Sequence, residues 1–289
     1  MNVLSLFNGM NTGRQALENV GIKVNKYYSS EIKPYAIELT QHHFPDTIQV
    51  GDVTKWKEWA IDWQTIDLIL SGSPCQDLSS AGKRAGINGS KSSLFFVFVE
   101  ILEHIKSLNP KVLFLQENVG SANKYDIGIM SRALGVYPVR INSSLVTAQL
   151  RDRYYWSNIR TKETMFDVVT DIPQPKDKNL LLQNIITQGR AIDKKAFALL
   201  QSTSVSFGGY RDKKSNIVQV ALRKRHKKSF LNIIEEEGFI RYFNQIELER
   251  LQGFQDGYTS ILSWNKSMSL LGDGWTLPII EHIFKFIEQ

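Results

Sequence analysis

The segment Asp67-Leu-Ile-Leu-Ser-Gly-Ser-Pro-Cys-Gln-Asp-Leu-Ser79 contains the only cysteine in a chain of 289 residues. Its apolar run at residues 68–70 predicts a buried strand of a parallel sheet, and the Ser-Gly-Ser-Pro that follows predicts a turn at the carboxyl end of this strand. Open α/β sheets carry their chemistry at that edge. The segment therefore predicts an α/β fold in which Cys75 lies at the mouth of a cleft.

Cys75 itself has two interpretations. A free cysteine is among the most often buried residue types, where it serves as a small hydrophobic side chain. A thiol that follows a strand end can instead act as a nucleophile. The segment alone supports both interpretations equally.

The amino-terminal residues predict a nucleotide-binding arrangement of strand, glycine turn and helix. Residues 3–7 form the predicted strand, residues 8–13 the turn and residues 14–20 the helix. Gly9 and Gly13 would let the backbone approach a ligand closely, and the helix amino terminus favours a carboxylate or phosphate. A pair of glycines also occurs in ordinary tight turns, so the pattern alone is not specific.

Acidic residues follow the next two predicted strands. Glu31 ends the strand at 24–30, and Asp52 closes the strand at 48–51, after a predicted helix at 34–43. An acidic residue at the end of the second strand commonly binds ribose hydroxyls. These positions therefore favour a nucleotide-like cofactor.

A third acid, Glu117, ends the predicted strand at 112–115, which follows an apolar helix at 94–105. It could be a solvated residue on the rim of the sheet. Because the preceding strand in sequence carries Cys75, the carboxylate and the thiol could also share one cleft.

Residues 78–93 are rich in glycine, serine and basic residues and have no hydrophobic period, which predicts a loop. A disordered connector is one interpretation. A long loop beside a nucleophile at a strand end is more often a lid. As a lid, this loop would offer Lys83, Arg84 and Lys91 to phosphates.

Two further strands are predicted at 137–142 and 153–159. Gln149, Arg151 and Arg153 alternate before the second of them, so in an extended segment all three point to one side. A salt-bridged surface edge is the alternative interpretation.

From residue 161 onward the composition changes to a small insert. Residues 173–179 resemble a linker, and residues 223–228 form a compact basic block. Such a block is usually a solvated face, but it also resembles a localisation signal or a phosphate contact. Helical order returns at 240–254, where Gly253 is the expected stop, and an apolar helix runs to Phe286.

Composition limits the possible classes. Hydrophobic content is 42% and charged content 22%, as in an ordinary globular protein. The net charge of +6 suits a polyanionic partner without requiring one. The sequence has no run of eighteen apolar residues that could span a membrane. Its first residues resemble a core strand and not a signal peptide, so we expect a cytoplasmic protein. One cysteine excludes internal disulfides, and the five histidines lack metal-ligand spacing, so we expect no structural metal.

The segments together resemble the DNA cytosine-5 methyltransferase family, which uses S-adenosylmethionine. Six short motifs occur in the family's order, from the first strand to the last helix. They are Leu6-Phe-Asn-Gly9 through Gly13, Ser73-Pro-Cys-Gln76, Glu117-Asn-Val119, Gln149-x-Arg151-x-Arg153, Glu247-x-x-Arg-Leu-Gln-Gly-Phe254 and Leu271-Gly-Asp-Gly-Trp275.

The residues within these motifs are most similar to those of the animal de novo DNA methyltransferases, although the chain has the compact size of bacterial and phage members. One position departs from the pattern. Asp273 stands where most members carry Asn and the de novo branch carries Arg.

The resemblance implies a doubly wound, Rossmann-like methyltransferase domain at residues 1–160, completed by 262–289. Residues 161–261, including the motif helix near 246–253, would form a small target recognition domain. The implied partner is double-stranded DNA in a bacterial or phage-infected cell, in the setting of restriction and modification. We expect a monomer or a weak dimer.

The implied reaction is methyl transfer to C5 of a flipped-out cytosine through a covalent bond between Cys75 and C6. Glu117 would contact the N3 and N4 edge of the base, Arg153 would hold O2, and Arg151 would position Glu117 or the loop. Two alternatives stay open: a tRNA cytosine-5 methyltransferase, disfavoured because the Cys-Phe-Thr signature of that branch is absent, and a non-catalytic DNA-binding regulator.

The resemblance also assigns residues to the two ligands. The expected cofactor residues are Phe7, Gly9, Asn11, Thr12, Gly13, Glu31, Ile32, Asp52, Val53, Pro74, Asp273 and Trp275. The expected DNA-binding residues are Gln76, Ser79, Lys83, Arg84, Lys91, Arg223, Lys224 and Arg225.

Overall fold

The computed structural model describes residues 1–74, 93–188, 190–191, 193–199, 217–218, 233–234 and 241–288. The chain forms two compact units. Unit 1 contains Met1–Ile141, Asp152–Gln174 and Ile280–Gln289, and unit 2 contains Asn142–Arg151 and Pro175–Ile279. These bounds differ from the expected domain bounds, since residues 142–151 and 262–279 group with unit 2. The assignment of a catalytic and a recognition domain stays a prediction.

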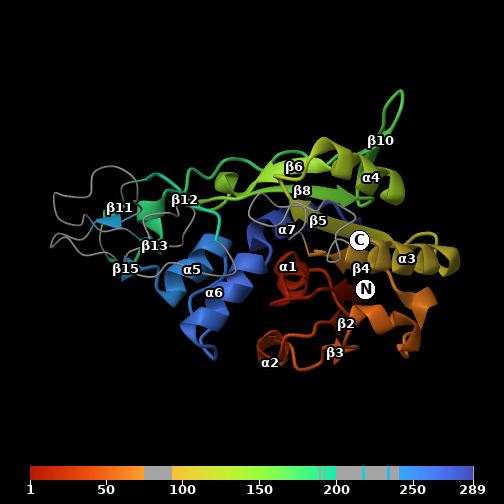
Figure 1. Cartoon of the computed structure of the whole chain (residues 1–289), viewed down its shortest axis with the longest axis horizontal. Coiled ribbons are helices and arrows are strands. Elements are labelled where there is room, and N and C mark those ends of the chain that lie inside the picture. Colours follow the sequence, from red (N-terminus) through yellow and green to blue (C-terminus); the bar gives the residue numbers. More distant parts are fainter. Residues whose placement is uncertain are drawn as a thin grey trace. The chain divides into compact units, whose positions relative to one another are not determined.

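A seven-stranded sheet forms the centre of unit 1, with the strand order β3-β2-β1-β4-β5-β8-β6 (Figure 1). The strands are β1 (Asn2–Leu6), β2 (Lys26–Ser30), β3 (Ile48–Gln49), β4 (Leu68–Ser71), β5 (Leu113–Val119), β6 (Val139–Asn142) and β8 (Asp152–Ser157).

The five strands β3, β2, β1, β4 and β5 are parallel to one another, and β8 pairs antiparallel with β5. The chain winds outward from β1 in one direction through β2 and β3, and then in the other through β4 and β5. This order creates a topological switch point between β1 and β4, where such sheets bind ligands. The predicted doubly wound α/β class is confirmed.

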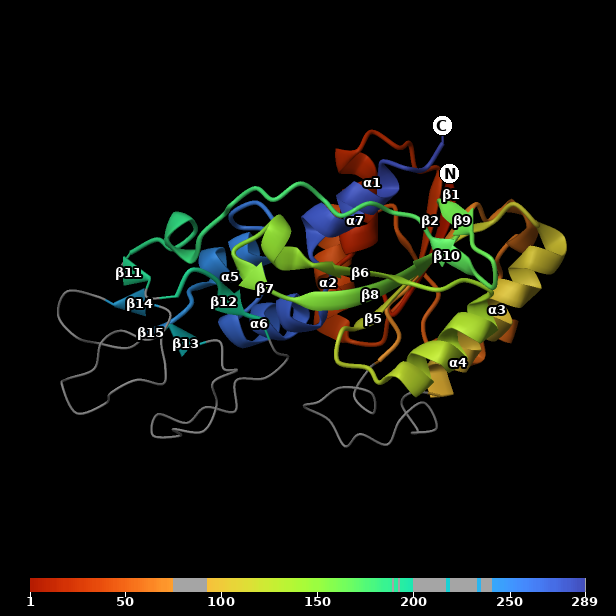
Figure 2. The same cartoon turned by 90° about the horizontal axis from the view of Figure 1, so that it is seen from above.

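Helices cover both faces of the sheet, with α1 and α7 on one face and α3 and α4 on the other (Figure 2). The helices of unit 1 are α1 (Thr12–Asn19), α2 (Pro34–His43), α3 (Ser93–Leu108), α4 (Lys124–Leu134) and the later turns of α7 (Leu277–Phe284). The predicted helix at 34–43 has the observed bounds. Short 3-10 turns η1 (Val53–Glu58) and η2 (Trp63–Thr65) connect β3 to β4.

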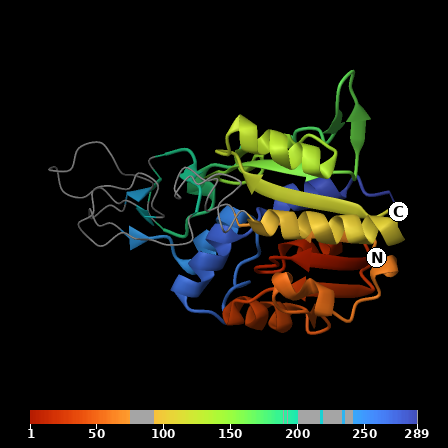
Figure 3. The same cartoon turned by 45° about the vertical axis from the view of Figure 1, so that its right-hand side comes forward.

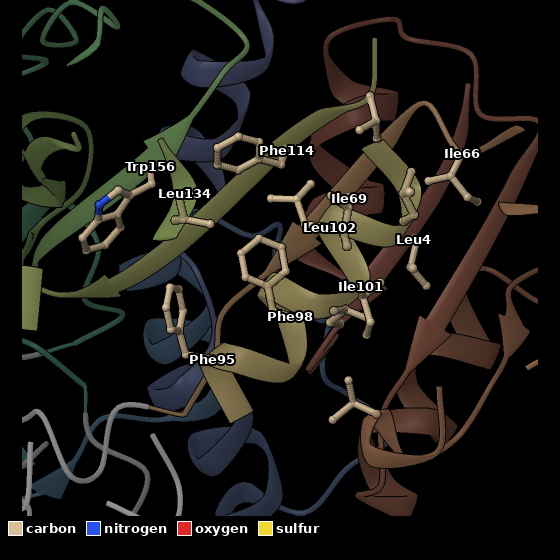
Figure 4. Packing of buried hydrophobic residues seen from close by; sticks show 14 of the residues in the cluster. Leu4, Ile66, Ile69, Phe95, Phe98, Ile101, Leu102, Phe114, Leu134 and Trp156 are labelled. Atoms are coloured by element: carbon tan, nitrogen blue, oxygen red, sulfur yellow. The ribbon is translucent and has the colours of Figure 1, made fainter. Parts of the chain in front are cut away.

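The main core lies between α3 and the sheet, where α3 runs alongside β5 (Figure 3). Phe95, Phe98 and Leu102 recur at helical spacing and are fully or almost fully buried. Phe98 points toward Phe114 of β5, and Leu102 lies beside Ile69 of β4 (Figure 4). Burying each such side chain contributes about 1.5–3 kcal/mol, so this layer holds the two central strands in place.

One strand boundary differs from the prediction. We expected a strand at 112–115 with Glu117 beyond its end, but β5 continues to Val119. The antiparallel strand β8 pairs with this extension, since Glu117 lies opposite Tyr155 and Val119 opposite Arg153. Glu117 is therefore fixed by backbone pairing inside a strand and is not a flexible rim residue.

A two-stranded hairpin of β9 (Thr161–Glu163) and β10 (Val168–Thr170) follows β8 in unit 1. Met165 and Phe166 at its turn are 87% and 86% exposed. No helix in the described residues is long and apolar enough to cross a bilayer.

Unit 2 consists of short elements around two helices, α5 (Gln245–Gln252) and α6 (Trp264–Asp273). The chain leaves α5 at Gly253, which has φ 81°, so the predicted helix stop is confirmed. A Cβ at this glycine would overlap Pro278. The other elements are η3 (Ser143–Leu145), β7 (Gln149–Leu150), η4 (Leu182–Asn184), β11 (Arg190–Ala191), β12 (Ala196–Phe197), β13 (Ile217–Val218), β14 (Ile233–Ile234) and β15 (Arg241–Tyr242).

Candidate active site

The carboxyl edge of the parallel strands gathers the predicted site residues of unit 1. The glycine loop follows β1, Glu31 follows β2, Asp52 follows β3 closely, and Pro74 follows β4. Glu117 lies in the carboxyl half of β5, one residue beyond Gln116, the register partner of Ser71. Residues separated by up to 110 positions in sequence thus meet at one edge of one sheet.

The loop after β1 has an unusual backbone. Phe7, Gly9 and Asn11 have φ values of 55°, 59° and 65°, so every second residue is left-handed. A bulky residue such as Phe7 rarely adopts this conformation, which costs on the order of 1–3 kcal/mol and needs support from its surroundings. The alternation turns the chain sharply from β1 into α1, whose first backbone amides have no partner within the helix.

Glu31 supplies part of that support. Its Oε2 accepts a hydrogen bond of 2.8 Å from the Gly9 amide, and its Oε1 accepts bonds of 2.8 and 2.9 Å from the amides of Ile32 and Lys33. The carboxylate thus connects the loop after β1 to the chain after β2. Oε2 keeps capacity for a further donor, because a carboxylate oxygen can accept two hydrogen bonds.

Asn11 lies at the amino terminus of α1 and is fully buried. Neither polar atom of its side chain has a hydrogen-bond partner within the described part of the chain. A buried amide without partners is costly, and this one lies in the loop that the sequence assigned to a cofactor. The residues present therefore fit a ligand with polar groups at this position.

Asp52 is exposed and caps η1. Its Oδ1 accepts bonds of 2.9 Å from both the amide and the hydroxyl of Thr54. These bonds hold the pKa of the Asp52 carboxyl below its usual range. Ile32, beside Glu31, is 69% exposed and offers an apolar surface near these acids, whereas Val53 is buried in the core.

Glu117 and Arg153 form an ion pair across β5 and β8, with 2.7 Å between Oε1 and Nε. Their side chains are 11% and 16% exposed, so the pair is largely desolvated. Arg153 Nη1 also donates to the Asp152 carbonyl at 2.8 Å, and the Gly120 amide donates to the same oxygen at 3.0 Å. The guanidinium is therefore oriented before any ligand binds.

Sequence reasoning missed Gln116, which is fully buried beside this pair. Its Nε2 donates to the Ser73 hydroxyl at 3.0 Å and to the Glu117 carbonyl at 2.7 Å. The signal in the sequence that could have indicated its role is a glutamine within a central, buried strand, because amide side chains are seldom buried without a structural or functional role.

Gln149 and Arg151 fall in unit 2, whereas Arg153 falls in unit 1. Gln149 bonds the Leu251 carbonyl and the Leu199 amide. Arg151 donates to the carbonyls of Leu199, Gly272 and Gly274 at 3.2, 3.0 and 2.8 Å.

Gln149 and Arg151 are 0% and 3% exposed, so the interpretation of a salt-bridged surface edge is wrong for them. The two glycine carbonyls that Arg151 binds lie on either side of Asp273 in sequence, and the second comes directly before Trp275. Asp273 is exposed at the end of α6, and Trp275 is partly buried. Arg151 thus ties the arginine motif to the last motif within one unit. Its expected action on Glu117 stays a prediction.

Several predicted residues lie outside the described part of the chain. They are Cys75, Gln76, Ser79, Lys83, Arg84, Lys91, Arg223, Lys224 and Arg225. Within the described ranges, no group of three or more His, Cys, Asp or Glu residues is arranged to hold a metal ion.

The doubly wound sheet with its glycine loop after β1 is a Rossmann-like methyltransferase fold. The family model described as "C-5 cytosine-specific DNA methylase" matches residues 1–289. The chain therefore belongs to this family.

Curated relatives are bacterial and phage methyltransferases. The chain is 33% identical over 172 residues to the orphan methyltransferase M.SPRI of Bacillus phage SPR, covering 55% of this chain and 38% of the relative. It is 27% identical over 264 residues to the type II methyltransferase M.NlaIV of Neisseria lactamica, covering 81% and 60%. The matches thus span only part of the length of these two relatives.

Solved structures share the fold over the full chain. A methyltransferase of Entamoeba histolytica, EhMeth, covers 100% of this chain and 99% of its own, with a TM-score of 0.70 and 16% identity. A DNMT2 mutant of Spodoptera frugiperda covers 99% of both chains, with a TM-score of 0.65 and 18% identity.

Proposed function

We propose that this protein transfers a methyl group from S-adenosylmethionine to C5 of a flipped-out cytosine in double-stranded DNA. The observation that carries the proposal is the desolvated Glu117–Arg153 pair at the carboxyl edge of the sheet. It supplies a carboxyl group and a cation beside the end of β4. This strand ends at Ser71, four residues before the family's motif cysteine, Cys75.

Unit 1 offers the groups that S-adenosylmethionine needs. We infer that Glu31 and Asp52 accept hydrogen bonds from its hydroxyl and amino groups, and that Ile32 contacts the adenine ring. The buried Asn11 amide and the positive amino terminus of α1 suit the amino acid end of the cofactor. The cofactor, when bound, supplies an electrophilic methyl group.

Cytosine C5 is a poor nucleophile, and we assign its activation to Cys75. The thiolate adds to C6 and forms an Sγ–C6 bond, while the electron pair of the C5–C6 double bond moves toward C5 and N3 takes a proton from Glu117. After methylation, C5 loses its proton to water. The Sγ–C6 bond then breaks, which restores the double bond and the thiolate, and the N3 proton returns to Glu117.

Arg153 has two tasks in this proposal. Its guanidinium holds O2 of the base and offsets negative charge that develops on the ring during addition. It also holds the Glu117 carboxyl group in place, with 2.7 Å between Nε and Oε1. Because few waters reach either side chain, both interactions are stronger than they would be at the surface.

The base must leave the duplex stack to reach this edge, at a cost of a few kcal/mol. We assign closure over the flipped nucleotide to the loop with Gln76, Ser79, Lys83, Arg84 and Lys91, and contact with flanking DNA to the basic block with Arg223, Lys224 and Arg225. Base contacts would supply sequence specificity, and phosphate contacts would supply most of the affinity.

The family description supports DNA as the substrate, and the type II and orphan names of the curated relatives support a role in restriction and modification or as an orphan enzyme. Since those relatives come from a phage and a bacterium, we place the protein in the cytoplasm of a bacterial or phage-infected cell, as a monomer or weak dimer. A tRNA cytosine-5 methyltransferase stays the second candidate, and the DNMT2 structure, which shares the fold alone, does not decide between the two substrates.

Tritiated S-adenosylmethionine, offered with duplex DNA and total tRNA in parallel, tests the substrate. We expect label in DNA and none in tRNA above a boiled-enzyme control. Label in tRNA alone would replace the proposal with the second candidate.

Removing the acids that follow β2 and β3 should weaken cofactor binding. We expect Glu31→Ala and Asp52→Ala each to raise the Kd for S-adenosylmethionine, by about ten- to a hundredfold for Glu31→Ala, which loses a charged acceptor. Titration calorimetry measures the effect, with Glu103→Ala as control because Glu103 forms only a surface pair with Lys106. Unchanged affinity in both variants would contradict the cofactor site.

Replacing the basic block should change the salt dependence of DNA binding. If Arg223, Lys224, Arg225, Lys227 and Lys228 contact phosphates, changing all five to Gln should lower the slope of log K against log salt by about 0.9 per lost contact. Affinity should fall similarly for cognate and random duplexes. An unchanged slope would show that the block is a solvated face and would move the phosphate contacts to the loop with Lys83 and Arg84.

A further inference from the structure

Gln116 connects the ends of the two central strands of unit 1. It lies on β5 opposite Ser71 of β4 and is fully buried. One amide hydrogen goes to the Ser73 hydroxyl at 3.0 Å, and the other goes to the Glu117 carbonyl at 2.7 Å. Both N–H groups of the side chain therefore donate hydrogen bonds, one to the segment that follows β4 and one to β5 itself.

The orientation of this amide follows from its partners. The Glu117 carbonyl can only accept, so the amide nitrogen must face it. A flipped amide would place two oxygens in contact and would break the bond to the Glu117 carbonyl, although the Ser73 hydroxyl could still donate to the amide oxygen. The nitrogen is thus committed to Glu117 and Ser73, and the bridge has one stable arrangement.

The bridge is costly, which argues that it has a task. Gln116 Oε1 has no hydrogen-bond partner in the ranges that the structure describes. A buried acceptor without a donor costs about 1–3 kcal/mol, which an apolar side chain of the same volume would avoid. The amide is therefore a poor choice for packing alone.

We propose that Gln116 is a positioning residue for the reaction, acting through Ser73 and Glu117. Ser73 is 4% exposed and lies two residues before Cys75 in sequence. The amide holds the peptide that carries the Glu117 carboxylate against the segment that carries the thiol. This inference rests on the proposed function, because it needs Cys75 and Glu117 to act on one base.

The direct test compares wild type with Gln116→Met, which keeps the volume and removes both donors. We expect kcat to fall about ten- to a hundredfold, because small errors in the alignment of reacting groups are amplified in the rate. The KM for S-adenosylmethionine should change less than about twofold, because the two hydrogen bonds that the amide donates go to Ser73 and Glu117, neither of which is a proposed cofactor residue.

Ser73→Ala removes the other end of the bridge and should lower kcat similarly. The double variant should be no worse than the poorer single variant, since the two side chains act through one hydrogen bond. Trapping with 5-fluorocytosine duplexes reads addition and methyl transfer apart from elimination, because a C5 atom that carries fluorine has no proton to lose. Adduct formation should slow in all three variants.

Gln116→Glu provides a conservative rescue with a pH signature. Only the protonated carboxyl can donate a hydrogen bond, so its activity relative to wild type should rise as pH falls. A packing role would give no such dependence. Methyl transfer measured across pH for both proteins distinguishes the two.

The matched control is Asn158→Ala. Asn158 makes the same kind of amide bonds to the opposite end of β5, since it accepts from the Phe114 amide at 2.7 Å and donates to the Val112 carbonyl at 2.9 Å. It should lower the Tm and leave kcat within about twofold of wild type, as expected for a bond away from the chemistry.

Two outcomes would overturn the inference: a Gln116→Met enzyme with kcat near wild type, or effects of Gln116→Met and Ser73→Ala that simply multiply. A wild-type protein without methyl transfer would be a different failure, because it would remove the proposed function and the inference together.

Discussion

Replacing Cys75 with serine should abolish methyl transfer, to below about a hundredth of the wild-type rate, because a hydroxyl is a far weaker nucleophile than a partly ionised thiol at neutral pH. The effect should appear in kcat, and no adduct with a 5-fluorocytosine duplex should form. Steady-state kinetics with tritiated cofactor measures the first result, and denaturing electrophoresis of the trapped complex measures the second.

Cofactor binding provides the control for this variant. The thiol is proposed to attack the base and not the cofactor, so the Kd for S-adenosylmethionine should stay near wild type. Residual activity above about a hundredth of wild type would contradict the covalent assignment. It would favour the interpretation of Cys75 as a buried hydrophobic residue.

Replacing Arg153 with alanine should lower kcat by about 10²–10³-fold, the usual loss when one preorganised donor to a developing negative charge is removed. The change also leaves the Glu117 carboxylate, whose side chain is 11% exposed, without its 2.7 Å partner. Single-turnover kinetics with saturating DNA should show the loss in the addition step.

Arg160→Ala is the matched control for Arg153→Ala. Arg160 pairs with Asp171 at 3.0 Å, but both side chains are well exposed at 48% and 39%. Exposed pairs contribute only about 0–1 kcal/mol, so this variant should keep kcat within about twofold. Similar losses in both variants would mean that Arg153 acts through general stability and not at the base.

The sequence predicted the sheet edge well because its signals are local. Apolar strand runs followed by glycine, proline or acid mark strand ends, and parallel strands bring those ends together. Glu31, Asp52 and Glu117 were found in this way. The stop of α5 at Gly253 followed from the same kind of local rule, because glycine alone adopts φ 81° without strain.

Other features depend on contacts between distant segments and carry little local signal. The extension of β5 through Glu117 needs β8 as a partner, some 38 positions away, at Tyr155. Gln116 and Ser73 meet only because β4 and β5 are neighbours. The alternation of Gln149, Arg151 and Arg153 was visible in the sequence, but their division between two units was not.

The central claim is that Glu117, Arg153 and Cys75 act on cytosine at C5. Mass spectrometry of nucleosides from duplex DNA, treated with the protein and S-adenosylmethionine carrying a deuterated methyl group, tests it most directly. We predict labelled 5-methyldeoxycytidine as the product in wild type and its loss in Cys75→Ser and Arg153→Ala. Label found on the N4 of cytosine or the N6 of adenine, or on C5 with undiminished yield in both variants, would contradict the claim.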